Sequence, residues 1–164
     1  MRTIFTAMAA LALAACGSED AEPSAQGTTA PAANDNAVAR AESGLEVIPV
    51  TVTTEEGSHT FQTEIAATRQ EQSRGMMFRT EMGEDEAMIF PYEVADMRSF
   101  WMKNTFIPLD IIFIAEDGTI INIADGVPYN ENSVASEAPA IAVLELSGGR
   151  AEELGIGPGD RVEW

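Results

Sequence analysis

The stretch Leu109–Ile114, with the sequence LDIIFI, constrains the fold most strongly because apolar side chains fall on both of its faces. Side chains alternate across a strand, so Leu109 and Phe113 share one face while Asp110 shares the other with Ile112. A buried strand is therefore predicted over Leu109–Ala115. A carboxyl group placed among such neighbours needs a partner or a raised pKa, which makes Asp110 a residue to explain.

Further segments rich in β-branched and apolar residues are predicted to be strands: Val47–Thr53, Thr60–Ala66, Ala87–Phe90, Met97–Lys103, Thr119–Ala124, Ile141–Leu146 and Arg161–Trp164. The Asp117–Gly118 pair between two of them is a strong hairpin signal, and Gly57 lies in a second turn between strands. Many short strands favour a mainly β fold, either a small β-sandwich or a flattened barrel with one or two short helices.

Two short helical segments interrupt this pattern. Thr68 and Glu71 have the spacing of a capping box, and Gly75 can supply the residue that ends the helix they begin. A helical turn is predicted around Arg150–Leu154. The long polar segment Asp125–Pro139 is predicted to be a loop that borders any pocket, since loops of this length in compact domains are often functional.

The first 44 residues have a different composition from the rest of the chain. Residues 1–15 combine an early arginine with a short apolar run, which is typical of a secretory signal peptide and too short for a membrane-spanning helix. Leu13–Cys16 resembles the lipobox of bacterial lipoproteins, so Cys16 is predicted to be lipidated. Residues 17–44 lack an apolar period and are predicted to be a flexible tether after Cys16, leaving residues 45–164 as one β-rich domain.

The charge and the residue counts exclude several classes of function. The chain has 27 acidic and 9 basic residues, a net charge of −18, so nucleic acid is not an expected partner. Cys16 is the only cysteine and His59 the only histidine, which argues against internal disulfides, a thiolate metal cage and a Ser-His-Asp triad. The sequence predicts no cofactor.

Charged residues within apolar segments are the candidate site. Two interpretations remain open: an internal ion-pair network that fixes strand register, with Lys103 as the first candidate partner of Asp110, or a pocket for a small polar ligand. Arg74 and Arg79 could each grip a buried carboxylate bidentately. The predicted ligand-binding residues are Trp101, Lys103, Asn104, Asp110, Glu145, Arg74 and Arg79.

Two alternatives involve specific chemistry. Asp110 and Glu145 could act as the acid and base of a hydrolase, provided that their carboxyl groups lie close together. Thioether sulfurs select Cu(I), which makes Met76, Met77 and Met102 candidate copper ligands. Their spacing and the lack of a supporting histidine favour the alternative, that these methionines fill an irregular core.

Several motifs together resemble one family of proteins. They are Arg74-Gly75-Met76-Met77 with Arg79, Met88-Ile89-Phe90, Phe100-Trp101-Met102-Lys103-Asn104-Thr105, Ile107-Pro108-Leu109-Asp110, Leu144-Glu145-Leu146, and Gly155-Ile156 with Gly159-Asp160. In this order they resemble the domain of unknown function 192 family, with Ala87 standing where the family pattern usually has glycine. The resemblance implies a compact β-rich domain, often exported or lipid-anchored in bacteria, without an established activity.

These observations lead to one functional expectation. We expect a lipid-anchored protein of the cell envelope, facing the periplasm and held at the outer membrane. We expect it to be a non-catalytic binding or accessory module. Its expected partners are the membrane, through Cys16, and an unknown small molecule or envelope protein.

Overall fold

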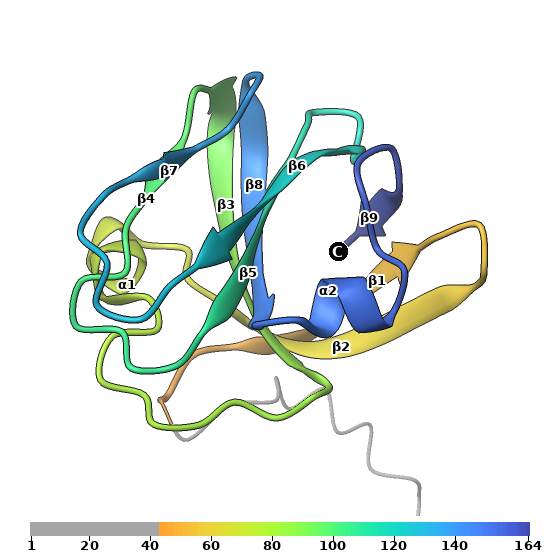
Figure 1. The fold of residues 1–164 in the computed structure, drawn as a ribbon. Coiled ribbons are helices and arrows are strands. Elements are labelled where there is room, and N and C mark those ends of the chain that lie inside the picture. The colour runs from red at the N-terminus through yellow and green to blue at the C-terminus, as the bar shows by residue number, and fades with distance from the viewer. Residues whose placement is uncertain (1–42) are drawn as a thin grey trace, which may run out of the picture. The chain divides into compact units, whose positions relative to one another are not determined.

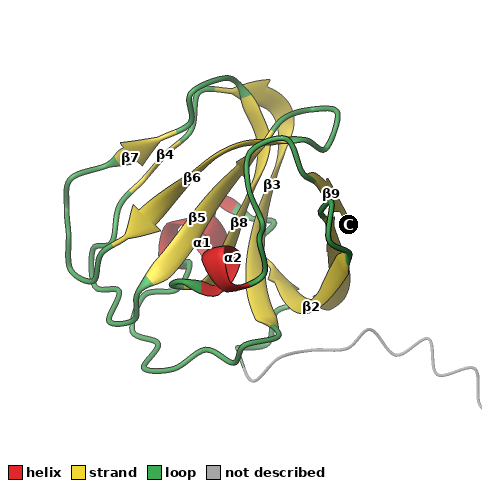
Figure 2. Ribbon diagram, turned by 45° about the vertical axis from the view of Figure 1, so that its right-hand side comes forward, coloured by secondary structure: helices red, strands yellow, loops and turns green. Residues whose placement is uncertain are grey.

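The computed structural model describes residues 43–164, which form a mainly β fold with two short helices, as predicted (Figures 1 and 2). The signal peptide, Cys16 and the tether up to residue 42 lie outside the described residues. The elements are β1 (Val47–Thr53), β2 (Ser58–Ile65), α1 (Arg69–Arg74), β3 (Glu86–Asp96), β4 (Ser99–Phe100), β5 (Leu109–Ile114), β6 (Ile120–Gly126), β7 (Val134–Ala135), β8 (Ala140–Ser147), α2 (Arg150–Glu153) and β9 (Arg161–Glu163).

Seven strands form one mixed sheet in the order β6-β5-β8-β3-β2-β1-β9, and β4 pairs with β7 in a small second sheet. Strands β2 and β3 run parallel, and a parallel pair needs a crossover connection. The segment that contains α1 forms this connection. The large sheet curls until its two ends approach each other at the bridge between Thr119 and Arg161. The N–H of Ile120 also donates to the carbonyl of Asp160 at 2.8 Å. The two edge strands are thus joined at one point, without a continuous ladder that would close a barrel.

Buried side chains form two clusters, one on each face of β3, β5 and β8. The inner cluster, enclosed by the curl, includes Ile112 and Leu144 and extends to Ala151 of α2. The outer cluster includes Ile111 and Val143, and α1 and the small sheet lie over this face (Figure 1). The central strands are therefore covered on both sides, which explains why all six residues of β5 are buried.

The local signals of the sequence are largely confirmed. Thr68 and Glu71 form the capping box at the start of α1, and Gly75 follows its last residue with a φ of 43°. Gly75 also lies against the ring of Phe90, where an added Cβ would come within 3.3 Å of the ring carbon Cζ. Both the positive φ and this tight contact with Phe90 favour glycine at that position.

Two predicted elements are wrong in extent. The expected strand Met97–Lys103 is reduced to the two residues of β4, since the chain turns away after Phe100 to cover the outer cluster. The expected loop Asp125–Pro139 contains the end of β6 and all of β7. Between residues 43 and 164 there is no helix of the length and apolar character needed to cross a membrane.

Candidate functional site

Asp110 is buried, and the backbone satisfies its carboxylate. Oδ1 accepts the N–H of Gly149 at 2.9 Å and Oδ2 accepts the N–H of Ala151 at 2.7 Å. The first N–H groups of a helix have no acceptor within the helix itself. The carboxylate of Asp110 supplies acceptors at the start of α2 and so holds the turn from β8 into α2. This is a structural role, and Lys103 has no part in it.

Glu145 is equally buried but has no partner. Its side chain has 5% of its surface exposed, and no hydrogen bond joins it to any residue of the described part of the chain. Burial raises the pKa of this carboxyl group to about 8, against a smaller opposing effect of the positive charge of Arg79. Glu145 is therefore protonated at neutral pH, an unusual state that often marks a functional position.

The strand register separates these two carboxyl groups. Asp110 lies opposite Leu146, whereas Glu145 lies opposite Ile111, so the two acidic side chains point to opposite faces of the sheet. The predicted acid/base pair is therefore wrong, because a sheet packed on both faces lies between its two members.

A small cavity of about 50 Å³ lies on the outer face at Glu145. One water needs roughly 10 to 15 Å³, so the cavity has room for a group of a few non-hydrogen atoms. The cavity is lined by three aromatic rings, two methionines, a glycine and five polar or charged side chains: Phe90, Phe100, Trp101, Met76, Met77, Gly75, Gln72, Ser73, Arg74, Thr105 and Glu145. We call it the Glu145 pocket.

The structure brings only some of the predicted site residues into this pocket. Trp101, Glu145 and Arg74 line it, and Arg74 is exposed at its edge. The ammonium group of Lys103 lies 5.0 Å from the centre of the Trp101 ring, outside the lining of the pocket. Asn104 lies nearby, with its side-chain amide 4.0 Å from the sulfur of Met77.

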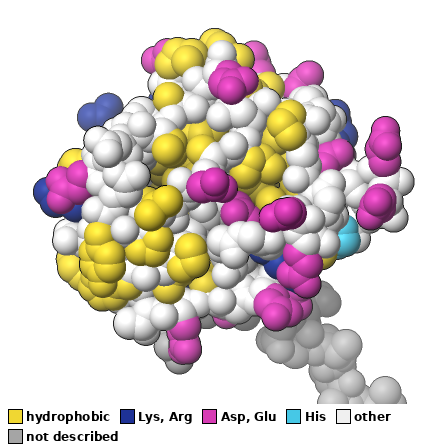
Figure 3. Space-filling model, viewed as in Figure 1, with side chains coloured by type: hydrophobic (Ala, Val, Ile, Leu, Met, Phe, Trp, Pro, Cys, Tyr) yellow, Lys and Arg dark blue, Asp and Glu magenta, His cyan; other side chains and the backbone are white. Residues whose placement is uncertain are grey.

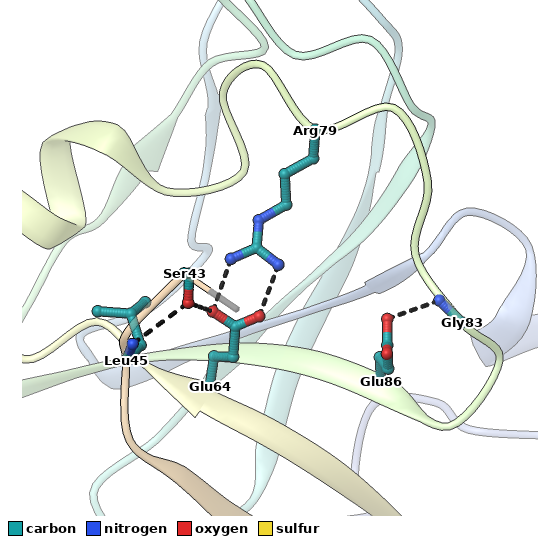
Figure 4. Close-up of polar contacts among 6 residues, drawn as sticks. All are labelled: Ser43, Leu45, Glu64, Arg79, Gly83 and Glu86. Atoms are coloured by element: carbon teal, nitrogen blue, oxygen red, sulfur yellow. Dashed lines mark hydrogen bonds and ion pairs between the residues drawn. The ribbon is translucent and has the colours of Figure 1, made fainter. Parts of the chain in front are cut away.

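Arg79 binds the carboxylate of Glu64 and not that of Asp110 or Glu145. Its guanidinium binds both oxygens of Glu64 at 2.6 Å, and the hydroxyl of Ser43 donates to the same carboxylate (Figure 4). Desolvation raises the pKa of Glu64, but the hydrogen bonds of Arg79 and Ser43 outweigh it and leave that pKa lowered. The predicted bidentate contact is thus present with another partner.

A larger depression of about 1280 Å³ surrounds this ion pair. It is open to solvent, and most of its charged groups already have partners within the protein: besides the Arg79–Glu64 pair, Glu71 accepts the N–H groups of Ala67 and Thr68, and Glu86 accepts the N–H of Gly83 (Figure 4). A ligand there would compete with existing contacts, so the smaller Glu145 pocket is the better candidate.

The candidate copper ligands lie in and beside the outer cluster. Met76 and Met102 are buried in the outer cluster, where they fill the core as the alternative interpretation expects. Met77 is half-buried beside Asn104. Residues 43–164 also contain no group of three or more His, Cys, Asp or Glu side chains placed to hold a metal ion.

Three loops meet beside the pocket and expose aromatic side chains. The ring of Phe106 lies edge-on to Phe78, with 6.2 Å between centroids, and 5.4 Å from the ring of Tyr129. Phe78 and Tyr129 keep 54% and 64% of their surface exposed. The space-filling view shows hydrophobic side chains gathered at the lower left, over these loops (Figure 3). We call Phe78, Phe106 and Tyr129 the aromatic rim.

The backbone at this rim is strained. Phe78, Asn104 and Tyr129 are the three non-glycine residues of the described chain with positive φ, at 68°, 55° and 62°. Asparagine tolerates this region, but a bulky aromatic residue there is unusual. Two hydrogen bonds hold the three loops together. The N–H of Phe78 donates to the carbonyl of Asn104, and the N–H of Tyr129 donates to the carbonyl of Thr105. Such strain clusters at functional sites, which supports this end of the molecule as the site.

Sequence reasoning missed Phe78 and Phe106 because nothing local indicates that an isolated phenylalanine will be exposed. The sequence predicts that the segment Asp125–Pro139 borders the pocket. It supplies Tyr129 to the rim and an acceptor, the carbonyl of Asn130, for the N–H of Met102. It does not line the pocket itself.

Comparisons with known proteins agree with this fold. The model of the domain of unknown function 192 family, described as "Uncharacterized ACR", matches residues 50–164. A crystal structure of a protein of unknown function from Novosphingobium aromaticivorans is 51% identical, with a TM-score of 0.76, and the match covers 84% of this chain and all of that one. A "putative transcription regulator" from Sinorhizobium meliloti is 38% identical, with a TM-score of 0.70, over 73% of this chain and 94% of that one. No curated protein matches the chain.

Proposed function

We propose, for a chain that belongs to the domain of unknown function 192 family, that it acts as a non-catalytic ligand-binding module of the cell envelope and binds its ligand at the Glu145 pocket. The observation that carries this proposal is the buried carboxyl group of Glu145. Both of its oxygens lack hydrogen bonds within the described residues, although a cavity large enough for a small group lies beside it.

An unsatisfied buried polar group costs roughly 1 to 3 kcal/mol and is rare in native proteins. A ligand that supplied the missing hydrogen bond would recover this free energy on binding. Trp101, which is 47% exposed, and the aromatic rim would provide apolar contact area around the entrance. This division into a small polar centre and an apolar surround is typical of small-molecule sites.

The cell-envelope part of the proposal is supported by the sequence of residues 1–16. If Cys16 is acylated after signal cleavage, several acyl chains make membrane anchoring stable where one would be marginal. We expect the native chain to fractionate with membranes and to carry the mass of an acylated Cys16, and a Cys16→Ser form to lose both properties. A Cys16→Ser form that still fractionates with membranes would refute the anchor.

The ligand-binding part is tested by native mass spectrometry of the purified chain. We expect a small molecule to copurify with the wild-type protein and to be lost from the Glu145→Leu variant. Glu152→Leu is the matched control, since Glu152 is exposed on α2 and does not line the pocket. Equal occupancy in both variants would show that the ligand binds elsewhere.

A further inference from the structure

The polar groups of the Glu145 pocket differ in what they can still bind. Gln72 donates its side-chain amide to the carbonyl of Pro91, and the hydroxyl of Ser73 donates to the carbonyl of Arg69. The hydroxyl of Thr105 donates to the carbonyl of Lys103 at 3.4 Å. These three side chains therefore each direct a donor at a backbone acceptor, whereas the indole N–H of Trp101 and the guanidinium of Arg74 have no hydrogen bond within residues 43–164.

The acceptors of the pocket are uncommitted. The carboxyl oxygens of Glu145 accept nothing within residues 43–164, and the amide oxygen of Gln72 has no hydrogen bond there either. The sulfurs of Met76 and Met77 can act as weak acceptors. Arg74 is a donor and not an acceptor. It is exposed at the edge of the pocket, where its side chain can extend into solvent.

The walls also favour positive charge. Phe90, Phe100 and Trp101 line the pocket, and aromatic faces attract cations within about 6 Å of the ring centre. Trp101 already attracts one cation, because the ammonium group of Lys103 lies 5.0 Å from its ring. The net charge of −18 adds a negative field that raises the local concentration of cations.

We propose that the Glu145 pocket binds a small primary ammonium group, with the Glu145 carboxylate as its counter-charge and the ring of Trp101 against its alkyl chain. This inference rests on the proposed function, because it names the class of ligand for the same pocket. The cavity of about 50 Å³ has room for the end of such a chain. A free alkylamine and the side chain of a lysine on a partner protein share this chemistry.

Binding of an ammonium group requires Glu145 to lose a proton. The charged or titratable groups around the pocket are Arg79, whose positive charge acts on the carboxyl group of Glu145, Arg74 at the pocket edge, Tyr92 of β3, and Lys103, whose ammonium group lies 5.0 Å from the Trp101 ring. Burial raises the pKa of Glu145 to about 8, so one proton leaves for each ammonium bound at neutral pH. The affinity should then rise with pH, by up to about tenfold per unit below pH 8, while an alkylamine with a pKa near 10.4 stays charged.

The test is a titration of the purified full chain, labelled with ¹⁵N, followed through the indole N–H signal of Trp101. This signal is assigned by its loss in Trp101→Phe. Methylammonium represents the free amine, and Nα-acetyl-lysine methylamide represents a lysine side chain. Acetamide and acetate are the neutral and anionic probes of similar size.

We expect both amines or one of them to shift the Trp101 signal saturably, with an affinity that rises from pH 6 to pH 8. Glu145→Gln should weaken this binding about tenfold or more, because it removes a charge-assisted contact, while Glu152→Gln leaves it unchanged. Saturation by methylammonium alone, or by the lysine derivative alone, identifies the source of the ammonium group.

Other results overturn the inference. Binding of acetamide or acetate without the amines would refute the ammonium class while leaving the ligand-binding function in place. Amine binding that Glu145→Gln does not weaken would show that the carboxylate is not the counter-charge. Absence of any amine effect on Trp101 also refutes the inference, and the copurification experiment then decides separately whether the pocket binds a ligand.

Discussion

Asp110 and Glu145 carry buried carboxyl groups on neighbouring strands, and the two groups differ in their hydrogen-bond partners. Asp110 lies on the inner face and accepts two backbone N–H groups from the turn before α2. Glu145 lies on the outer face beside a cavity and accepts none. Burial alone therefore does not indicate function. The difference lies in whether the protein itself supplies the partners that a buried carboxyl group needs.

The largest effect is expected at Asp110. Asp110→Ala removes two charge-assisted hydrogen bonds and leaves two N–H groups of the α2 turn without acceptors, so we expect a loss of about 3 to 5 kcal/mol in the free energy of unfolding. Urea unfolding of residues 43–164 at pH 7 measures it. Asp110→Asn keeps one acceptor oxygen and should lose less. A loss below about 1 kcal/mol for Asp110→Ala would make Asp110 as dispensable as a surface residue.

Glu145 should behave in the opposite way, with an effect that depends on pH. Burial raises its pKa in the folded state to about 8, while the ordinary value is 4.5, so between these values the folded chain holds a proton that the unfolded chain has lost. The stability that this group contributes is complete below pH 4.5 and is lost as the pH rises to about 8.

The matched variant is Glu145→Gln, which cannot ionise. We expect the stability of the wild-type domain relative to this variant to fall by up to about 1.4 kcal/mol per pH unit between pH 5 and 8, measured by urea unfolding across that range. A constant difference between the two proteins would mean that Glu145 titrates like a solvated side chain. The comparison with Asp110 would then lose its basis.

An intermediate effect is expected at the bidentate pair between Arg79 and Glu64. Arg79→Ala leaves a carboxylate with 12% side-chain exposure without its main partner, so we expect a loss of about 1 to 2 kcal/mol at pH 7, between the values for surface and buried pairs. The lowered pKa of Glu64 makes this contribution disappear as the pH falls through that pKa, the reverse of the trend at Glu145. Unfolding at pH 7 and pH 3 tests both points, and an equal loss at the two pH values would contradict them.

The sequence predicts local structure here better than it predicts partners. The capping box of Thr68 and the hairpin at Asp117–Gly118 depend on neighbouring residues, and both are present in the structure. Alternation within each strand also gives the neighbours of Asp110 and Glu145 on their own strands correctly. The relative register of β5 and β8 is not encoded locally, and a shift by one residue would bring both carboxyl groups to one face.

The candidate site was partly predictable for the same reason. Trp101, Arg74 and Glu145 were recognised as residue types suited to a pocket, and the fold brings them together. The aromatic rim depends on three loops that meet only in the folded chain, so Phe78 and Phe106 carried no local signal. Lys103 is a candidate partner of Asp110 by its charge alone, and its segment leaves the sheet after Phe100.

The smallest effect is therefore expected at Lys103, the partner first considered for Asp110. Its ammonium group is half-exposed and contacts the Trp101 ring at 5.0 Å, a cation–π contact worth about 0.5 to 1 kcal/mol at most when exposed to solvent. Lys103→Met keeps most of the apolar side chain and should change the free energy of unfolding by no more than about 1 kcal/mol. In a double-mutant cycle with Asp110→Ala, the coupling energy should also stay below about 0.5 kcal/mol, because the carboxylate of Asp110 binds Gly149 and Ala151 instead. A coupling energy of 2 kcal/mol or more would mean that Lys103 and Asp110 act in one ion-pair network. That result would contradict the structure, in which Lys103 lies against Trp101 and Asp110 binds the backbone before α2.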